Sequence, residues 1–136
     1  MLELQHIVAD SGPKRVGPFS HAVKAGDFVF VTGQMPTMPD DPSRPVEGGI
    51  EAQTHRVMEN LKLVLHSAGL DFDRVVFARV YLVNFQDFGK MNAVYETYFR
   101  ADALPSRTCE CAATMHNFTG WPDKPGKKRP GRIGSE

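Results

Sequence analysis

The order of the predicted elements indicates an α+β fold, because strands and helices follow one another as β-β-β-α-β-α-β. Two runs of β-branched and aromatic residues, at positions 28–32 and 75–83, have the composition of strands. Between them, residues 50–68 carry apolar side chains at the i, i+3, i+4 and i+7 spacing of an amphipathic helix. Together the three segments predict a sheet with helices packed on it.

The first part of the chain is predicted to form strands joined by turns. Residues 6–9 are a short candidate strand, and a Gly-Pro turn at 17–18 leads into a second strand ending at Val23. Gly26-Asp27 fits a hairpin turn, since both residues tolerate positive φ. The strand at 28–32 is apolar throughout, so we expect it to be covered on both faces.

Gly33 follows this strand and has two interpretations. Glycine lets a ligand or another backbone approach closely, but a simple bulge or strand end explains it equally well. Residues 37–49 are rich in proline and glycine and predict a surface loop. The helix at 50–68 should end at Gly69, which can adopt the left-handed conformation.

The second half is predicted to hold a central strand at 75–83, a second helix and a last strand at 107–113. Asp87 is the expected N-cap of the second helix. The buried stripe of this helix should consist of Phe88, Met91, Tyr95, Tyr98 and Phe99. Asn92 lies near that stripe, where it is either a buried hydrogen-bonding support or an exposed residue.

Composition sets the remaining boundaries. A chain of 136 residues predicts one domain, here residues 1–113, followed by a basic, Pro/Gly-rich tail at 114–136. Sixteen basic and 16 acidic residues cancel, so no overall field favours nucleic acid or membrane. No leader or membrane span is recognisable, and Cys109 and Cys111 are too close in sequence to favour a disulfide. We therefore expect a cytoplasmic, reduced protein.

Arg107 is the residue with the clearest chemical potential. Pro105 ends the preceding helix and biases Leu104 toward extended geometry, so Arg107 opens a strand behind a stiff entry. A guanidinium presents a planar fork of donors that can grip a carboxylate through two parallel bonds. Arg107 is accordingly either an anchor for a small anion, or a surface or ion-paired strand residue.

Five sequence blocks resemble the reactive intermediate deaminase (RidA/YjgF-like) family, in order and over residues 7–110. These blocks lie at residues 17–23, 30–36, 80–88, 91–99 and 105–109. The resemblance implies a chorismate-mutase-like α+β fold, with two helices packed on one face of a mixed sheet. It also implies a homotrimer with clefts between the subunits.

The same resemblance implies an activity. Family members hydrolyse reactive 2-imino and 2-enamino acids, such as 2-aminoacrylate or 2-iminobutanoate, to 2-keto acids and ammonia, without metal or organic cofactor. Carried over to this chain, Arg107 would clamp the substrate carboxylate. The backbone of Gly33 and Cys109 would contact the reacting end, Asn92 would line the cleft, and Phe19 would cover it. The partners expected are this substrate and further copies of the chain.

Two positions depart from the family pattern. The family usually has tyrosine where Phe19 stands. Its last strand, which carries an acidic residue thought to orient the hydrolytic water, has no counterpart after Ala113. Losing a proton-transferring carboxylate typically costs about 10²–10⁴-fold in rate, so catalysis would be slowed without necessarily being abolished.

Three other functions remain open from the sequence. A trimeric module that binds small carboxylates without turning them over is compatible with the missing acidic residue. An RNA-directed role, as a translation inhibitor or endoribonuclease, is opposed by the balanced charge and supported only by the basic tail. A metal site at Cys109, Cys111 and His116 lacks a fourth ligand at suitable spacing.

Overall fold

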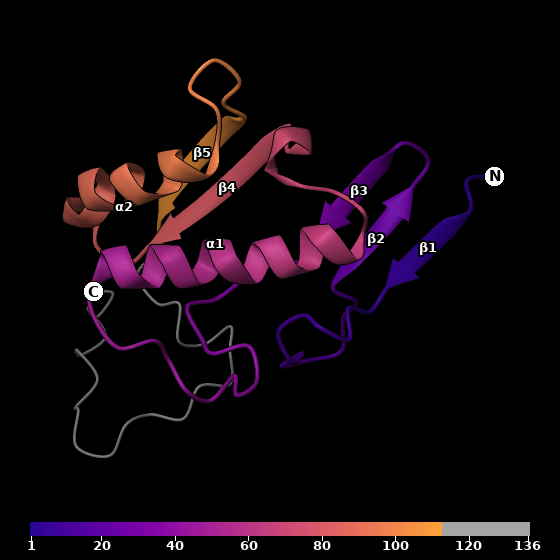
Figure 1. Cartoon of the computed structure of the whole chain (residues 1–136), viewed down its shortest axis with the longest axis horizontal. Helices are drawn as coiled ribbons and strands as arrows, with labels where there is room; N and C mark the ends of the chain where they lie inside the picture. Colours follow the sequence, from indigo (N-terminus) through magenta and orange to yellow (C-terminus); the bar gives the residue numbers. More distant parts are fainter. Residues whose placement is uncertain (113–136) are drawn as a thin grey trace, which may run out of the picture.

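A computed structural model describes residues 1–112 of the chain. Both helices lie on the same face of the strands (Figure 1), which confirms the predicted α+β class with two helices packed on one face. The elements are β1 (Leu4–Ile7), β2 (Ala22–Ala25), β3 (Phe28–Val31), α1 (Ile50–Ser67), β4 (Phe77–Leu82), α2 (Phe88–Tyr95) and β5 (Ser106–Cys111). Short 3-10 helices lie at Phe72–Arg74, Phe85–Asp87 and Glu96–Tyr98.

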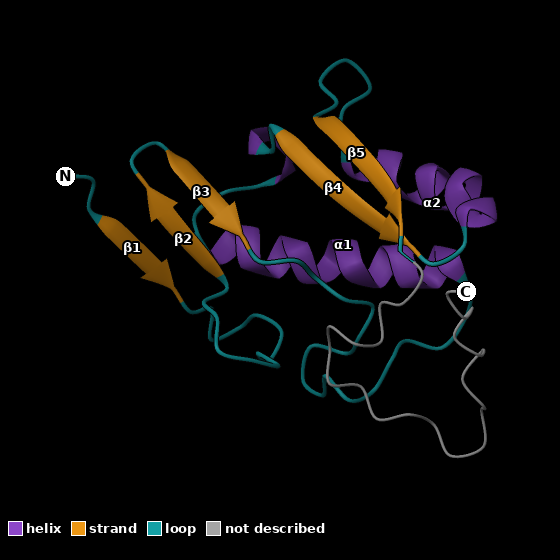
Figure 2. Ribbon diagram, turned by 180° about the vertical axis from the view of Figure 1, so that it is seen from behind, coloured by secondary structure: helices purple, strands orange, loops and turns teal. Residues whose placement is uncertain are grey.

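The strands form an antiparallel group and a parallel group. β1, β2 and β3 are successive antiparallel neighbours, with Ala22 opposite both Ile7 and Val31. β4 and β5 are parallel, from Phe77 opposite Ser106 to Leu82 opposite Cys111. β3 and β4 point in the same direction (Figure 2), but no ladder joins these two groups within residues 1–112.

Two expectations about strand burial are wrong for the single chain. β3 is covered on one face only, since Phe28 and Phe30 are 63% and 67% exposed. β4 is not central among the described residues, because β5 is its only partner there. An apolar composition predicts that both faces of a strand are buried, but it cannot show what packs against each face.

The predicted first helix is confirmed. α1 begins at Ile50 and ends at Ser67, and Gly69 follows it with φ of +72°. Its buried residues include Val64 and Leu65 as expected, together with Met58 and the polar Asn60, which the pattern did not single out. Met58 and Leu65 join the core that α1 forms with α2 and the sheet, alongside Phe72, Leu82, Met91 and Tyr95.

The start of the second helix differs from the prediction. Asp87 stands at the N-cap of α2 but makes no side-chain cap bond. Asn84 is the capping residue instead: its Oδ1 accepts from the Gln86 amide at 3.0 Å and so begins the preceding 3-10 turn. The expected apolar stripe is confirmed, with Met91 and Tyr95 buried and the other three members packed against the core.

The last predicted strand is confirmed as β5, from Ser106 to Cys111. The proposed tail at 114–136, His116 and the unmatched final strand of the family all lie outside the described residues.

Candidate functional site

Arg107 is the second residue of β5, opposite Ala78 of β4. Its side chain is half-buried, between exposed neighbours on the strand, and turns toward α2. The guanidinium carbon lies 4.7 Å from the ring centre of Tyr95 and 5.6 Å from that of Phe88. A guanidinium at such distances is held by cation–π attraction, so two rings of α2 support the Arg107 side chain.

Within residues 1–112, Arg107 makes no ion pair and no side-chain hydrogen bond. The arginines that do have side-chain partners are mostly exposed. Arg100, for example, binds Asp102 at 2.7 Å. Burying a charge without a partner is costly, and a forked cation is suited to bind a carboxylate. The interpretation of Arg107 as one half of an internal ion pair is therefore not supported by the described part of the chain.

Two further polar groups, both on α2, lack partners. The Asn92 Oδ1 and the Tyr95 hydroxyl are buried atoms without a hydrogen bond among the described residues. Burial raises the pKa of the Tyr95 hydroxyl, and the Arg107 charge opposes that shift only in part. The hydroxyl therefore stays protonated near neutral pH. The alternative of an exposed Asn92 is excluded, since its amide oxygen is inside.

Phe19 and Gly33 lie elsewhere, along a small cavity of about 40 Å³ that Arg15 and Asn60 also line. A Cβ built on Gly33 meets no atom within 4 Å, and its φ is not positive. The chain's own packing therefore does not require glycine at position 33. Gly33 lies two residues after the end of β3, so a strand end and close approach by another molecule both fit this position.

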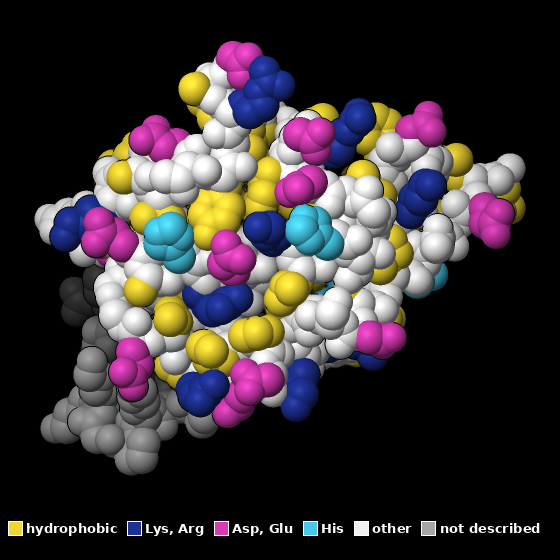
Figure 3. Space-filling view, viewed as in Figure 1, with side chains coloured by type: hydrophobic (Ala, Val, Ile, Leu, Met, Phe, Trp, Pro, Cys, Tyr) yellow, Lys and Arg dark blue, Asp and Glu magenta, His cyan; other side chains and the backbone are white. Residues whose placement is uncertain are grey.

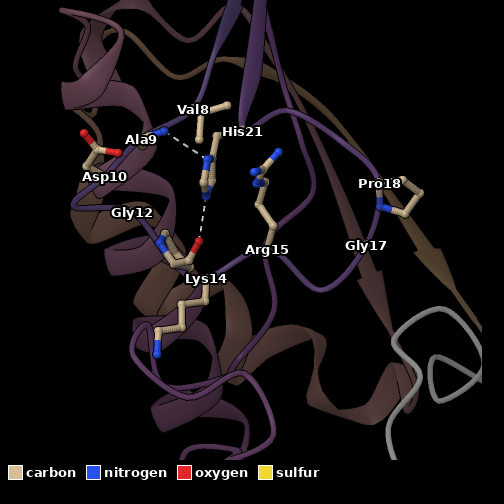
Figure 4. A pocket seen from close by; sticks show the side chains of 10 residues that line it. Val8, Ala9, Asp10, Gly12, Lys14, Arg15, Gly17, Pro18 and His21 are labelled. Carbon is tan, nitrogen blue, oxygen red and sulfur yellow. Dashed lines mark hydrogen bonds between the residues drawn. The ribbon is translucent and has the colours of Figure 1, made fainter.

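The loop that carries Phe19 is anchored by His21, a buried residue whose role no sequence pattern predicted (Figure 4). Its Nδ1 accepts from the Ala9 amide at 3.0 Å, and its Nε2 donates to the Pro13 carbonyl at 2.6 Å. These two bonds define a single neutral tautomer. His21 borders an open cavity of about 690 Å³ whose basic members are Lys14 and Arg15.

Asn60 anchors the segment after β3. Its Nδ2 donates to the carbonyls of Met35 and Thr37 at 2.9 Å each, and its Oδ1 accepts from Arg56. Its partners are up to 25 positions away in sequence, so no local pattern could reveal this role. The segment that begins at Gly33 is thus fixed to α1.

The structure divides the predicted site residues into two groups. Asn92, Arg107 and Cys109 belong to the α2–β5 side, whereas none of these three lines the cavity of Phe19 and Gly33. Gly33 follows the carboxyl end of β3, while Arg107 lies at the amino end of β5, and both strands run in the same direction (Figure 2). Within one chain the two groups of predicted site residues, here called half-sites, therefore lie apart.

No group of three or more His, Cys, Asp or Glu residues within positions 1–112 could hold a metal ion. Cys109 and Cys111 are both free thiols. Among the helices described, none is long and apolar enough to cross a membrane. On the helix-bearing face, acidic and basic side chains alternate with apolar ones and no region of one sign dominates (Figure 3).

Comparison with known proteins places this geometry in context. Residues 10–120 match the family model described as Endoribonuclease L-PSP. A RutC family protein of Pyrococcus abyssi is 45% identical over 101 residues, which cover 74% of this chain and 78% of that protein.

Solved structures agree with the fold. RidA from a Psychrobacter species has a TM-score of 0.75 at 31% identity, over 82% of this chain and 89% of the other. TdcF of E. coli, solved with bound serine, has a TM-score of 0.74 at 26% identity, over 82% and 88%. These likenesses confirm the RidA/YjgF-like fold that the sequence blocks predicted.

Proposed function

Since this chain belongs to the Endoribonuclease L-PSP family, which includes the RidA and RutC proteins, we propose that it is a hydrolytic deaminase of reactive 2-imino and 2-enamino acids. The observation that carries the proposal is the half-buried Arg107 guanidinium, which has no anionic partner among residues 1–112. A small substrate carboxylate supplies that partner. The serine bound to the related TdcF supports a ligand of this size and charge.

Each site residue has a role in this proposal. Arg107 holds the carboxylate through two parallel bonds, while the backbone groups of Gly33 and Cys109 contact the reacting end. Asn92 lines the cleft and Phe19 covers it. Positioning of this kind supplies several kcal/mol toward lowering a barrier. A 2-imino acid is already electrophilic, so water attack needs orientation more than a strong base.

The reaction balances without a cofactor. Water adds through its oxygen to C2 of the protonated imine, and the C=N electron pair moves to nitrogen. The resulting carbinolamine transfers a proton to nitrogen, the C–N bond breaks, and a 2-keto acid and ammonium leave. An enamine first takes a proton at C3 to become the imine. Backbone dipoles at the developing charge assist the addition.

The separation of the half-sites supports a homotrimer in which Arg107 of one subunit faces Phe19 and Gly33 of the next. The sheet face opposite the helices offers the contact area, because Phe28, Phe30 and Phe77 are each at least half exposed. Light scattering should give a trimer mass, and Phe30→Glu should shift it toward monomer. A stable wild-type monomer at micromolar concentration would count against shared clefts.

The activity is tested by ammonia release from 2-iminobutanoate generated in situ. The protein should exceed the enzyme-free rate, and Arg107→Ala should return the rate to background, because the carboxylate loses its anchor. Arg44→Ala is the matched control: this arginine is exposed and pairs with Asp40 in the loop before α1, so its loss should leave the rate unchanged. Equal rates for Arg107→Ala and wild type would refute the proposal.

A second candidate, a carboxylate-binding module without turnover, is favoured by one observation. Residues 114–121 contain no acidic residue to match the one in the family's last strand. Binding of 2-oxobutanoate that depends on Arg107, with ammonia release at the enzyme-free rate, would select this candidate over the deaminase.

A further inference from the structure

We infer that Tyr95 is a positioning residue for Arg107: its ring and hydroxyl, together with the amide oxygen of Asn92, hold the edge of the guanidinium that faces away from the ligand. This inference rests on the proposed role of Arg107 as a carboxylate clamp. It adds a residue that the sequence placed only in the apolar stripe of α2.

The first support is the arrangement along α2. Phe88, Asn92 and Tyr95 stand at positions i, i+4 and i+7 of one helix, so they share one face. The Arg107 guanidinium contacts the rings at both ends of this row, at 5.6 and 4.7 Å. Asn92 stands between Phe88 and Tyr95 in the sequence of α2 and shares their helix face.

The second support is the balance of donors and acceptors. A guanidinium carries five N–H donors, and a carboxylate gripped in parallel takes two of them. The remaining donors need acceptors, and Arg107 has none recorded within residues 1–112. The buried Asn92 Oδ1 and Tyr95 hydroxyl are acceptors without partners on the adjoining helix face. The donors without partners therefore lie beside the ring that carries one of these acceptors, and Asn92 shares the helix face of that ring.

The third support is that these two atoms are exceptional. They are the buried side-chain oxygens or nitrogens without a hydrogen bond in the described part of the chain. Tyr95 is only 8% exposed, so water does not readily satisfy its hydroxyl. A phenylalanine would fill the same space in the core without an unmet hydroxyl. A ligand-bound state in which Arg107 turns an N–H toward this oxygen accounts for tyrosine here.

The inference predicts how the site changes when a ligand binds. In the structure, the guanidinium lies against the two rings. When a carboxylate occupies the outer edge of the fork, the inner edge donates to Asn92 Oδ1 and the Tyr95 hydroxyl. The clamp is then fixed from both sides, and its orientation no longer depends on stacking alone.

The test compares Tyr95→Phe with Tyr98→Phe, using 2-oxobutanoate as the probe. The Tyr98 hydroxyl already has partners, His55 Nδ1 and Glu59 Oε1 at 3.0 Å each, which makes it a matched control. Tyr95→Phe should weaken binding about fivefold, the factor for one ordinary hydrogen bond. Its melting temperature should be unchanged or higher. Tyr98→Phe should show the reverse: a lower melting temperature and unchanged affinity.

A spectroscopic readout separates positioning from a structural effect. The Arg107 side-chain N–H signal, identified by its absence in Arg107→Lys, should exchange more slowly in wild type once 2-oxobutanoate is saturating. Tyr95→Phe should lose most of this slowing, and Asn92→Ala should lose part of it. Such a result supports the inference even if no ammonia is released, in which case only the deaminase proposal fails.

Three results would overturn the inference. The first is a Tyr95→Phe protein with wild-type affinity and wild-type N–H exchange, whether or not it releases ammonia. The second is a Tyr95→Phe protein that loses melting temperature as Tyr98→Phe does, which would make the hydroxyl structural. The third is a wild-type protein that does not bind 2-oxobutanoate, which would remove the clamp itself.

Discussion

The two half-sites differ in how their polar groups are satisfied. Around Phe19 and Gly33, the buried polar side chains are saturated: His21 uses both ring nitrogens, and Asn60 makes three hydrogen bonds. Around Arg107, the guanidinium has no bonded partner, and the Asn92 amide oxygen has none, within residues 1–112.

This difference in hydrogen bonding indicates different roles for the region around Gly33 and the region around Arg107. Saturated buried groups fix loops in place, because each unmade bond would cost on the order of 1–3 kcal/mol. Buried donors and acceptors that lack hydrogen-bond partners lower the stability of the protein. A bound ligand can supply the partners that they lack. We therefore expect the His21–Asn60 region to shape the site and the Arg107 region to receive the ligand.

Replacing Asn60 and Asn92 in turn should give the largest difference in stability between the two half-sites. Asn60→Ala removes bonds to Met35, Thr37 and Arg56 and leaves two carbonyls without their donor. We expect a loss of about 3 kcal/mol in the free energy of unfolding. Asn92→Ala should cost less than about 1 kcal/mol, because its buried oxygen has no bond to lose in residues 1–112. Urea denaturation of both variants measures the contrast, and equal losses would erase it.

The features that the sequence predicted correctly depend on residues that are close together in the chain. Prolines and glycines punctuate the chain, and the 3.6-residue period marks both helices, so α1, α2, β5 and the α+β class followed from neighbours in sequence. Arg107 could be singled out as a candidate ligand-binding residue because Pro105 and the strand pattern lie next to it in the sequence. The apolar stripe of α2 included Tyr95 but could not show that its hydroxyl is unmet.

Contacts between distant residues explain what the sequence could not give. His21 binds the backbone 8 and 12 positions away, and Asn60 binds it 23 and 25 positions away. Backbone amide and carbonyl groups are the same at every position. The residue type therefore cannot indicate which distant backbone group a side chain will bind. The single-sided cover of β3 likewise depends on the arrangement of whole elements, as does the separation of Gly33 from Arg107.

Gly33 tests whether a backbone position belongs to the scaffold or to the binding site. Because its position is open and its φ is not positive, Gly33→Ala should leave the unfolding free energy of an isolated chain unchanged. In the proposed trimer, the added methyl group should weaken binding of 2-oxobutanoate about tenfold by blocking close approach. Calorimetric titration and thermal melting are the measurements, and a destabilised variant with normal affinity would assign Gly33 to the scaffold.

Tyr98 gives the smallest effect and a pH signature for a satisfied hydroxyl. Burial, with the nearby Glu59 carboxylate, raises the pKa of Tyr98 to about 12. A pKa raised on folding contributes stability that is complete below the ordinary value of about 10 and is lost as pH rises toward 12.

Tyr98→Phe should therefore cost about 1 kcal/mol at neutral pH and flatten the fall in stability between pH 10 and 12. Stability curves across this pH range measure both effects. A variant that keeps the wild-type alkaline slope would show that Tyr98 is not the group responsible.

On the proposed function, Arg107 grips a carboxylate through two parallel hydrogen bonds. Calorimetric titration of 2-oxobutanoate into wild type, Arg107→Lys and Arg107→Ala tests it most directly. We expect measurable binding by wild type, at least about tenfold weaker binding by Arg107→Lys because a point charge cannot form two parallel bonds, and none by Arg107→Ala. Wild-type affinity in Arg107→Ala would contradict the account.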